Sequence, residues 1–150
     1  MARVVLLDSG PLGEITHPQS EKRGPIREWL VGLLETDAYP RLPEIVDCEH
    51  RRALLHRDAH RQIERLNAFK QVFGYEPLTT EAMLTAAELW ADARKRGLPT
   101  GTERELDIDV IISAQARVLE QDGEQVRVAT TNPRHLSRFV DARPWQEIQP

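Results

Sequence analysis

The chain has 150 residues, of which 40% are hydrophobic and 29% are charged. These proportions are typical of a folded globular domain and exclude a wholly disordered chain, and the length predicts a single domain over residues 1–150. The formal net charge of −4 at pH 7 excludes a protein that coats nucleic acid through a general basic field.

Apolar runs and cysteine content exclude two further classes. The longest purely apolar runs have about four residues, such as residues 4–7, whereas a membrane-spanning helix needs roughly 20. The short run before Asp8 is also too short for a secretory signal. The single cysteine, Cys48, can form neither an internal disulfide nor a zinc site with several thiolates. We therefore expect a cytoplasmic protein with no membrane span.

The first half of the chain alternates between strand and helix patterns. Residues 3–7 are β-branched and leucine residues that predict a buried strand, and residues 8–11 predict a polar turn after it. Apolar residues at helical intervals predict helices over 25–35 and from 44 to at least 56. A proline-interrupted segment between them predicts a strand over 38–42.

The second half continues the alternation. Helical spacing predicts helices over 58–73 and 80–96, which we expect to form a helical hairpin, and a further helix over 107–121. A strand follows over 125–130, and the tail around Trp145 is a candidate for a short edge strand. Strands separated by helices predict an α/β class with a parallel sheet. Ligands bind such sheets at the C-terminal ends of the strands.

Carboxylates occur where such a sheet would gather them. Asp8 directly follows the first strand, and Glu49 lies three residues after Val46 on its helix, in line with apolar positions. Asp107 and Asp109 stand at the start of an apolar helix, where Asp107 is expected to be the helix cap. Asp109 then lies in a buried first turn without a basic neighbour and is the better candidate for chemistry.

Structural alternatives exist for two of these acids. Asp8 could be an ordinary turn or cap residue. Glu49 could form a simple ion pair with Arg41 or Arg52. If the acids instead act together, their oxygens suit Mg²⁺ or Mn²⁺, and such a site can activate water for phosphodiester hydrolysis.

A polar segment follows the predicted strand over 125–130. Thr130 and Asn132 end this strand, and Arg134 and Arg138 are four residues apart on a predicted short helix. The two arginines could face one phosphate backbone. The structural alternative is a Thr-Asn-Pro turn with solvated arginines.

Together these segments resemble the PIN-domain family, and more narrowly the VapC-like toxins of prokaryotic toxin–antitoxin pairs. The resemblance rests on VVLLDSG at 4–10, LPEIVDCEHRR at 42–52, LDIDVIISAQA at 106–116 and VATTNPRHLSRF at 128–139. It implies a three-layer α/β/α domain with a small central parallel sheet and a helical hairpin insertion. It also implies endoribonuclease activity that depends on Mg²⁺ or Mn²⁺.

The resemblance also implies roles for individual residues. It assigns Asp8, Glu49 and Asp109 to catalysis and metal binding, with Ser9 and Thr130 as hydrogen-bonding supports. Asn132 occupies a position that is often acidic in the family, which leaves one ion as the safer expectation, and Asp107 is a further metal candidate that could compensate. Arg52, Arg134 and Arg138 are the candidates for RNA binding.

Expected partners are an RNA substrate, a second copy of the chain, and a small antitoxin whose peptide lies across the active-site cleft. One alternative function is an inactive or weak PIN-like module that binds RNA or protein, and another is a PIN nuclease outside any toxin–antitoxin system. A phosphatase with an aspartate nucleophile after its first strand is disfavoured, because the second acid of that family would fall at Gly10.

Overall fold

A computed structural model describes residues 3–98 and 102–150. Its centre is a five-stranded sheet in the order β3-β2-β1-β4-β5, in which every pairing is parallel. The strands are β1 (Arg3–Leu7), β2 (Ala38–Pro43), β3 (Tyr75–Glu76), β4 (Gln125–Ala129) and β5 (Ala142–Arg143). The predicted α/β class with a parallel sheet is confirmed.

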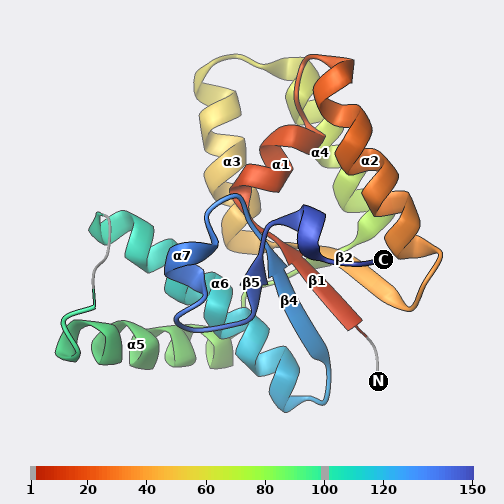
Figure 1. Cartoon of the computed structure of the whole chain (residues 1–150). Helices are drawn as coiled ribbons and strands as arrows, with labels where there is room; N and C mark the ends of the chain where they lie inside the picture. Colours follow the sequence, from red (N-terminus) through yellow and green to blue (C-terminus); the bar gives the residue numbers. More distant parts are fainter. Residues whose placement is uncertain (1–2, 99–101) are drawn as a thin grey trace.

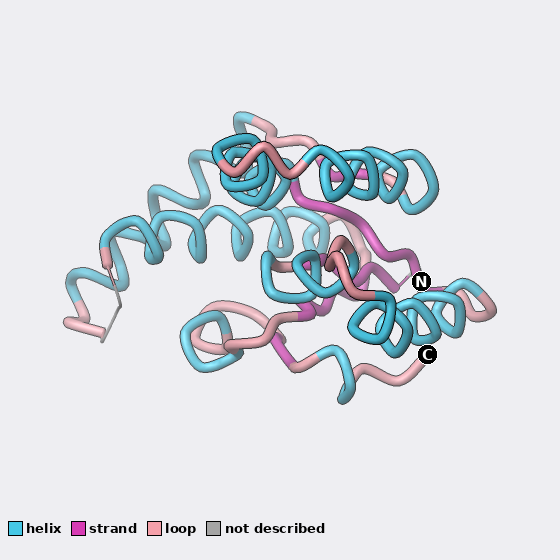
Figure 2. The backbone as a smooth tube through the Cα atoms, turned by 90° about the horizontal axis from the view of Figure 1, so that it is seen from above, coloured by secondary structure: helices cyan, strands magenta, loops and turns pink. Residues whose placement is uncertain are grey.

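Helices cover both sides of this sheet. They are α1 (Ser9–Ile15), α2 (Ser20–Leu34), α3 (Glu44–His56), α4 (His60–Phe73), α5 (Thr80–Lys95), α6 (Glu103–Gln121), α7 (Pro133–Leu136) and the 3-10 turn η1 (Trp145–Glu147). Figure 1 shows α1 to α4 gathered on one side of the sheet and α5 and α6 on the other. Seen from above, the strands lie between helices (Figure 2). Within the described residues, no helix combines the length and the apolar character that crossing a membrane requires.

Strand β1 is the centre of the core. Val4, Val5, Leu6 and Leu7 are each at most 2% exposed, because β1 lies between β2 and β4 with helices over both of its faces. Pro40 is tolerated in β2 because β2 pairs with β3 only at Leu42 and Pro43. Along the rest of β2, one side has no strand partner among the described residues, so no N–H is missed there.

The chain after β1 differs from the predicted turn. Asp8 is the N-cap of α1, and its side chain accepts a hydrogen bond from the Ser9 backbone N–H. Pro11 falls in the first turn of α1, where a missing N–H costs nothing. Helix α2 begins at Ser20 rather than at residue 25, because its polar first turn has no apolar periodicity to reveal it.

The predicted hairpin of the helices over 58–73 and 80–96 is wrong, although both helices exist. Helix α4 packs against α3 and β2, whereas α5 packs along α6. Leu89 and Ala93 of α5 form a second apolar cluster with Leu106 and Val110 of α6, separate from the main core. Strand β3, which follows α4, joins the edge of the sheet and so separates the two helices in the fold.

Helix α6 starts four residues before its predicted start. Thr102 is the N-cap, its hydroxyl accepts the Glu105 backbone N–H, and the Glu105 carboxylate accepts the Thr102 N–H. This reciprocal pair is a capping box. Asp107 is therefore not the cap of this helix, and it lies in the interior of α6, exposed to solvent.

The C-terminal tail binds to the first two helices. The strand expected around Trp145 lies slightly earlier, as β5, and residues 145–147 form η1. The indole N–H of Trp145 donates to Glu14 on α1 at 2.8 Å, and that of Trp29 on α2 donates to the Ile148 carbonyl at 2.8 Å. The two indole rings lie 5.5 Å apart.

Candidate functional site

A polar pocket of about 260 Å³ lies at the C-terminal ends of β1 and β4. It is lined by Asp8, Ser9, Glu49, Glu105, Ile108, Asp109, Thr131, Asn132 and His135. The three acids predicted for catalysis come from three distant segments and line this one pocket. The position agrees with the general rule that parallel sheets bind ligands at this edge.

Asp8 is held by hydrogen bonds from two neighbouring segments. One carboxylate oxygen accepts the Ser9 backbone N–H at 2.7 Å, and the other accepts the Thr130 hydroxyl at 2.8 Å. Thr130 is 1% exposed, and its oxygen accepts the Asn132 backbone N–H at 3.0 Å. These contacts fix the Asp8 carboxylate and connect it to the loop after β4. Ser9 and Thr130 thus make hydrogen bonds of the kind expected of them.

Glu49 reaches the pocket from α3 without an ion pair among the described residues. Arg41 pairs instead with Glu76 at 2.9 Å, and Arg52 is exposed and does not line the pocket. The predicted apolar line through Glu49 is only partly present, because Val46 is buried but Ala53 is exposed. The structural alternative of an ion pair for Glu49 is therefore not observed.

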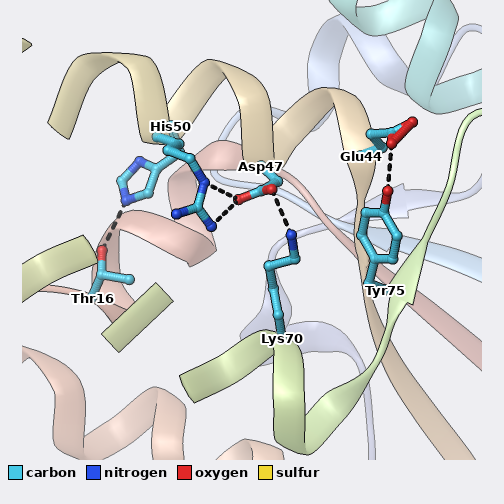
Figure 3. A network of polar contacts seen from close by, with 7 residues as sticks. Thr16, Glu44, Asp47, His50, Lys70 and Tyr75 are labelled. Atoms are coloured by element: carbon cyan, nitrogen blue, oxygen red, sulfur yellow. Dashed lines mark hydrogen bonds and ion pairs between the residues drawn. The ribbon is translucent and has the colours of Figure 1, made fainter. Parts of the chain in front are cut away.

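Contacts to its neighbours hold α3 in place (Figure 3). Asp47 accepts hydrogen bonds from Arg51 on α3 and from Lys70 on α4, both at 2.9 Å. Glu44 at the start of α3 accepts a hydrogen bond from the Tyr75 hydroxyl of β3. Charge-assisted bonds of this kind are stronger than neutral ones, so α3 is fastened to α4 and to the sheet edge.

His50 on α3 forms a hydrogen bond with the end of α1, the helix that Asp8 caps. The Thr16 hydroxyl donates its proton to the Leu12 carbonyl at 3.0 Å, so the His50 Nε2, 2.9 Å from the Thr16 oxygen, must carry a proton and donate. Burial lowers the pKa of His50, and the nearby Arg57 charge adds to the effect. This contact joins α3, which carries Glu49, to the C-terminal end of α1.

Burial and the neighbouring negative charges of the pocket both affect the pKa of Asp109. Burial, and then the Asp8 carboxylate, raise the pKa of Asp109 to about 7, with smaller contributions from Glu105 and Glu49. The charge of Arg138 acts in the opposite direction. A carboxylate with so high a pKa is poised between its two protonation states near neutral pH, which is common at functional sites.

The acids of α6 near Asp109 include one that sequence reasoning did not single out. Asp107 does not line the pocket, whereas Glu105 does. Glu105 precedes Asp109 by four residues, so the two share a helix face. The signal was the Thr102–Glu105 capping-box spacing, which sets the true start of α6. His135 and Thr131 were also missed, although they are four residues apart in the same polar segment.

The predicted RNA-binding arginines lie outside the pocket lining. Arg134 on α7 is exposed. The Arg138 Nε donates to the His135 carbonyl at 3.1 Å, and its guanidinium lies over the Phe139 ring at 5.5 Å. Arg138 thus acts on the pocket through its charge, as its effect on Asp109 shows, and through the backbone of His135.

The donors in the pocket fit a hard divalent cation in type. Carboxylate and hydroxyl oxygens are the ligands that Mg²⁺ and Mn²⁺ prefer, and the mutual effect of the acids on Asp109 shows a charge that a cation would neutralise. Across residues 3–98 and 102–150, no three Asp, Glu, His or Cys side chains are close enough together to hold one ion. Binding would therefore require the carboxylates to rotate toward the ion.

The sequence matches no family model, and no curated protein matches it. Its structure, however, is similar to solved structures over nearly the whole chain. For VapBC2 from Rickettsia felis bound to a promoter DNA fragment, the TM-score is 0.76 at 14% identity, covering 95% of this chain and 98% of that chain.

Two further structures give the same result. VapBC-1 from nontypeable Haemophilus influenzae matches with a TM-score of 0.72 at 15% identity, covering 96% of this chain and 99% of that one. FitAcB from Neisseria gonorrhoeae matches with a TM-score of 0.67 at 19% identity, covering 96% of this chain and 99% of that one. The chain has the PIN-like fold that its sequence predicts.

Proposed function

We propose that this protein is an endoribonuclease of the PIN type that depends on Mg²⁺ or Mn²⁺ and acts as the toxin of a toxin–antitoxin pair. The observation that carries the proposal is the convergence of Asp8, Glu49 and Asp109 in one pocket. The similarity of the fold to VapBC proteins adds support.

The pocket residues have distinct tasks in this proposal. When bound, the cation would supply an activated water and neutralise charge that develops on the phosphate. Asp8, Glu49 and Asp109 would hold it, with Asp8 oriented by Ser9 and Thr130. Asn132 lines the same pocket and adds no negative charge, so its amide would orient water or substrate.

Basic residues around the pocket would bind the RNA backbone. Arg52 and Arg134 are exposed on α3 and α7, the helices that also carry the pocket residues Glu49 and His135. Both would contact phosphates on either side of the scissile bond. The charge of Arg138, which already acts on Asp109, would add to this attraction.

The proposal includes a small antitoxin partner. Its peptide would lie across the pocket and present a basic side chain to the carboxylates. A second surface suits the same partner: a groove of about 370 Å³ between α2 and α4, with an apolar floor that includes Leu30 and Phe69. Arg23, Arg27 and Arg65 also line this groove, so an amphipathic helix with acidic flanks would complement it.

A second copy of the chain is the other proposed partner. Helix α5 packs on α6 through Ala86, Leu89 and Ala93, but it also exposes large apolar side chains. Met83 is 45% exposed and Leu84 is 64% exposed. A homodimer formed through this side of α5 would cover them.

The function is tested by incubating the purified, partner-free protein with a mixed panel of RNAs and a matched DNA panel, in Mg²⁺, Mn²⁺ or EDTA. Asp8→Asn and Asp109→Asn variants are run in parallel to exclude a contaminating nuclease. We expect RNA cuts that require the metal and are lost in both variants. Cleavage that survives in Asp8→Asn would contradict the proposal, and so would cleavage of the DNA panel alone. If the protein cleaves neither RNA nor DNA and does not bind Mn²⁺, the result would instead support a binding module.

A further inference from the structure

His135 lines the pocket but has no task in the function proposed above. The residue lies on α7 and is half-buried. Its ring forms no hydrogen bond or ion pair with any residue in the described part of the chain. The imidazole is therefore available to a molecule that enters the pocket.

The backbone of His135 is held in place on both sides. Its carbonyl accepts a hydrogen bond from the Arg138 Nε at 3.1 Å, and the Arg138 guanidinium lies over the Phe139 ring at 5.5 Å. The next residue, Leu136, is 1% exposed and belongs to the main hydrophobic core. Because the backbone is already fixed, a ligand that binds the ring has only the side-chain torsions to order, which keeps the entropy cost small.

The other four histidines of the chain differ from His135. His50 is hydrogen-bonded to Thr16 at 2.9 Å, and the His17 Nδ1 accepts the Gln19 backbone N–H at 3.0 Å. The remaining two, His56 and His60, are exposed and do not line the pocket. An imidazole without a described protein partner therefore lies at the pocket in one place, on α7.

The pocket needs donors if a phosphate is to enter it. The described residues that line it include four carboxylates and no lysine or arginine. Its other polar side chains, Ser9, Thr131 and Asn132, are neutral donors. A histidine ring carries at least one N–H in its neutral form and two in its charged form, and a hydrogen bond to an ionised oxygen is stronger than a neutral one. His135 is thus the lining side chain best suited to a phosphate oxygen that the cation leaves free.

We propose that His135 binds the scissile phosphate of the RNA by donating a ring N–H to a non-bridging oxygen. The proposal rests on the proposed function, since it concerns the substrate of the same pocket. It gives His135 a different task from the exposed Arg52 and Arg134, which would contact phosphates on either side. The contact requires no change in the protonation of the ring, because both forms can donate.

The experiment measures RNA affinity by fluorescence anisotropy, with a labelled RNA that the wild type cuts in Mg²⁺. Binding is measured in Ca²⁺, which takes oxygen ligands as Mg²⁺ does, and a gel checks that the RNA stays uncut. His135→Phe keeps a ring but has no N–H, whereas His135→Gln keeps a donor. We expect Kd to rise about tenfold or more in His135→Phe and by less in His135→Gln. In the matched control His60→Phe, outside the pocket, we expect a change of less than about twofold.

A modified RNA identifies the group that the ring contacts. A methylphosphonate at the cut linkage replaces one non-bridging oxygen with a methyl group and removes the negative charge. If His135 binds this oxygen, the difference in Kd between His135→Phe and the wild type should shrink to about twofold or less for at least one diastereomer. A methylphosphonate two linkages away should leave the difference in place.

A smaller variant and thermal unfolding separate contact from folding. His135→Ala has no N–H and cannot overpack, so it should lose affinity as His135→Phe does while unfolding near the wild-type temperature. If His135→Phe binds like the wild type and only His135→Ala is weak, the ring stacks on a base and the phosphate contact is overturned.

The remaining outcomes distinguish the two proposals. If the loss in His135→Phe persists with both diastereomers at the cut linkage, the ring contacts another part of the RNA, which also overturns the contact. In that case the proposed function stands, because the wild type still cuts RNA. If the wild type cuts no RNA with any metal, both proposals fail together.

Discussion

The burial of Asp109 in the acidic pocket costs stability. Its carboxyl group is buried near Asp8, and its pKa is raised to about 7 from an ordinary value of 3.8. In the unfolded chain the same group releases its proton near pH 4. The free energy of unfolding therefore falls as the pH rises from about 4 to 7, and above pH 7 the cost to folding is complete.

Replacing Asp109 should therefore stabilise the metal-free protein at alkaline pH. We expect Asp109→Asn to raise Tm by a few degrees at pH 8, where each kcal/mol shifts Tm by roughly 2–4 °C in a domain of this size. The gain should shrink toward zero as the pH falls toward 4. Thermal unfolding in EDTA between pH 4.5 and pH 8 measures it. Asp107→Asn controls for removing a charge from the same helix. An equal gain at both ends of the pH range would contradict the raised pKa.

Individual site residues were predictable where a strand pattern positions them. Asp8 follows an apolar strand, so the topology of a parallel sheet alone directs it to the ligand-binding edge, and Thr130 follows a second such strand. Glu105 was missed because its position depends on where α6 begins. The same error of four residues made Asp107 the expected cap of this helix, whereas Thr102 is its cap.

Helix starts and packing partners were the harder predictions at the scale of elements. The first turns of α2 and α6 are polar and are stabilised locally, by capping in α6, so apolar periodicity does not reveal them. Strands β3 and β5 have two residues each, too few to show an alternating pattern. The apolar residues Leu66 and Phe69 of α4 are buried as their spacing suggests, whereas α5 buries Ala86 and Leu89 and leaves Met83 exposed. Periodicity shows neither which face of a helix packs nor what it packs against.

Helix α1 makes a close contact that requires glycine at its second position. A Cβ atom on Gly10 would lie 2.2 Å from the Thr131 Oγ1 and 2.8 Å from its Cβ. Real Cβ atoms do not approach others so closely, and Thr131 lies in the loop that lines the pocket. The glycine thus allows the start of α1 to pack against the loop after β4.

We expect Gly10→Ala to lower the free energy of unfolding by about 1–3 kcal/mol, the usual cost of overpacking. Because the clash is with the Thr131 side chain, Gly10→Ala should cost less in a Thr131→Gly background than in the wild type. Urea denaturation of the two single variants and the double variant measures this coupling. Additive effects would show that the strain lies elsewhere.

At the scale of the whole molecule, the fold is closed by contacts between distant parts of the sequence. Strand β1 pairs with β4 in register, Leu7 opposite Ala129, and these two strands end at the pocket. The tail then returns to α1 and α2 through the two tryptophans. The sequence predicted β1 and β4 from their composition and a short strand in the tail. It did not predict the contacts of Trp29 and Trp145, since isolated tryptophans carry no periodicity.

The contact between Trp145 and Glu14 should therefore contribute to global stability. Trp145→Phe keeps most of the apolar contact with Trp29 but removes the indole N–H, which leaves a half-buried Glu14 carboxylate without this donor. We expect the free energy of unfolding to fall by about 1–2 kcal/mol. Adding Glu14→Leu removes the unsatisfied acceptor, so the double variant should be more stable than the sum of the two single effects predicts. Urea denaturation followed by far-ultraviolet circular dichroism measures both. If Trp145→Phe unfolds at the wild-type urea concentration, the hydrogen bond from the tail to Glu14 does not contribute to the stability of the fold.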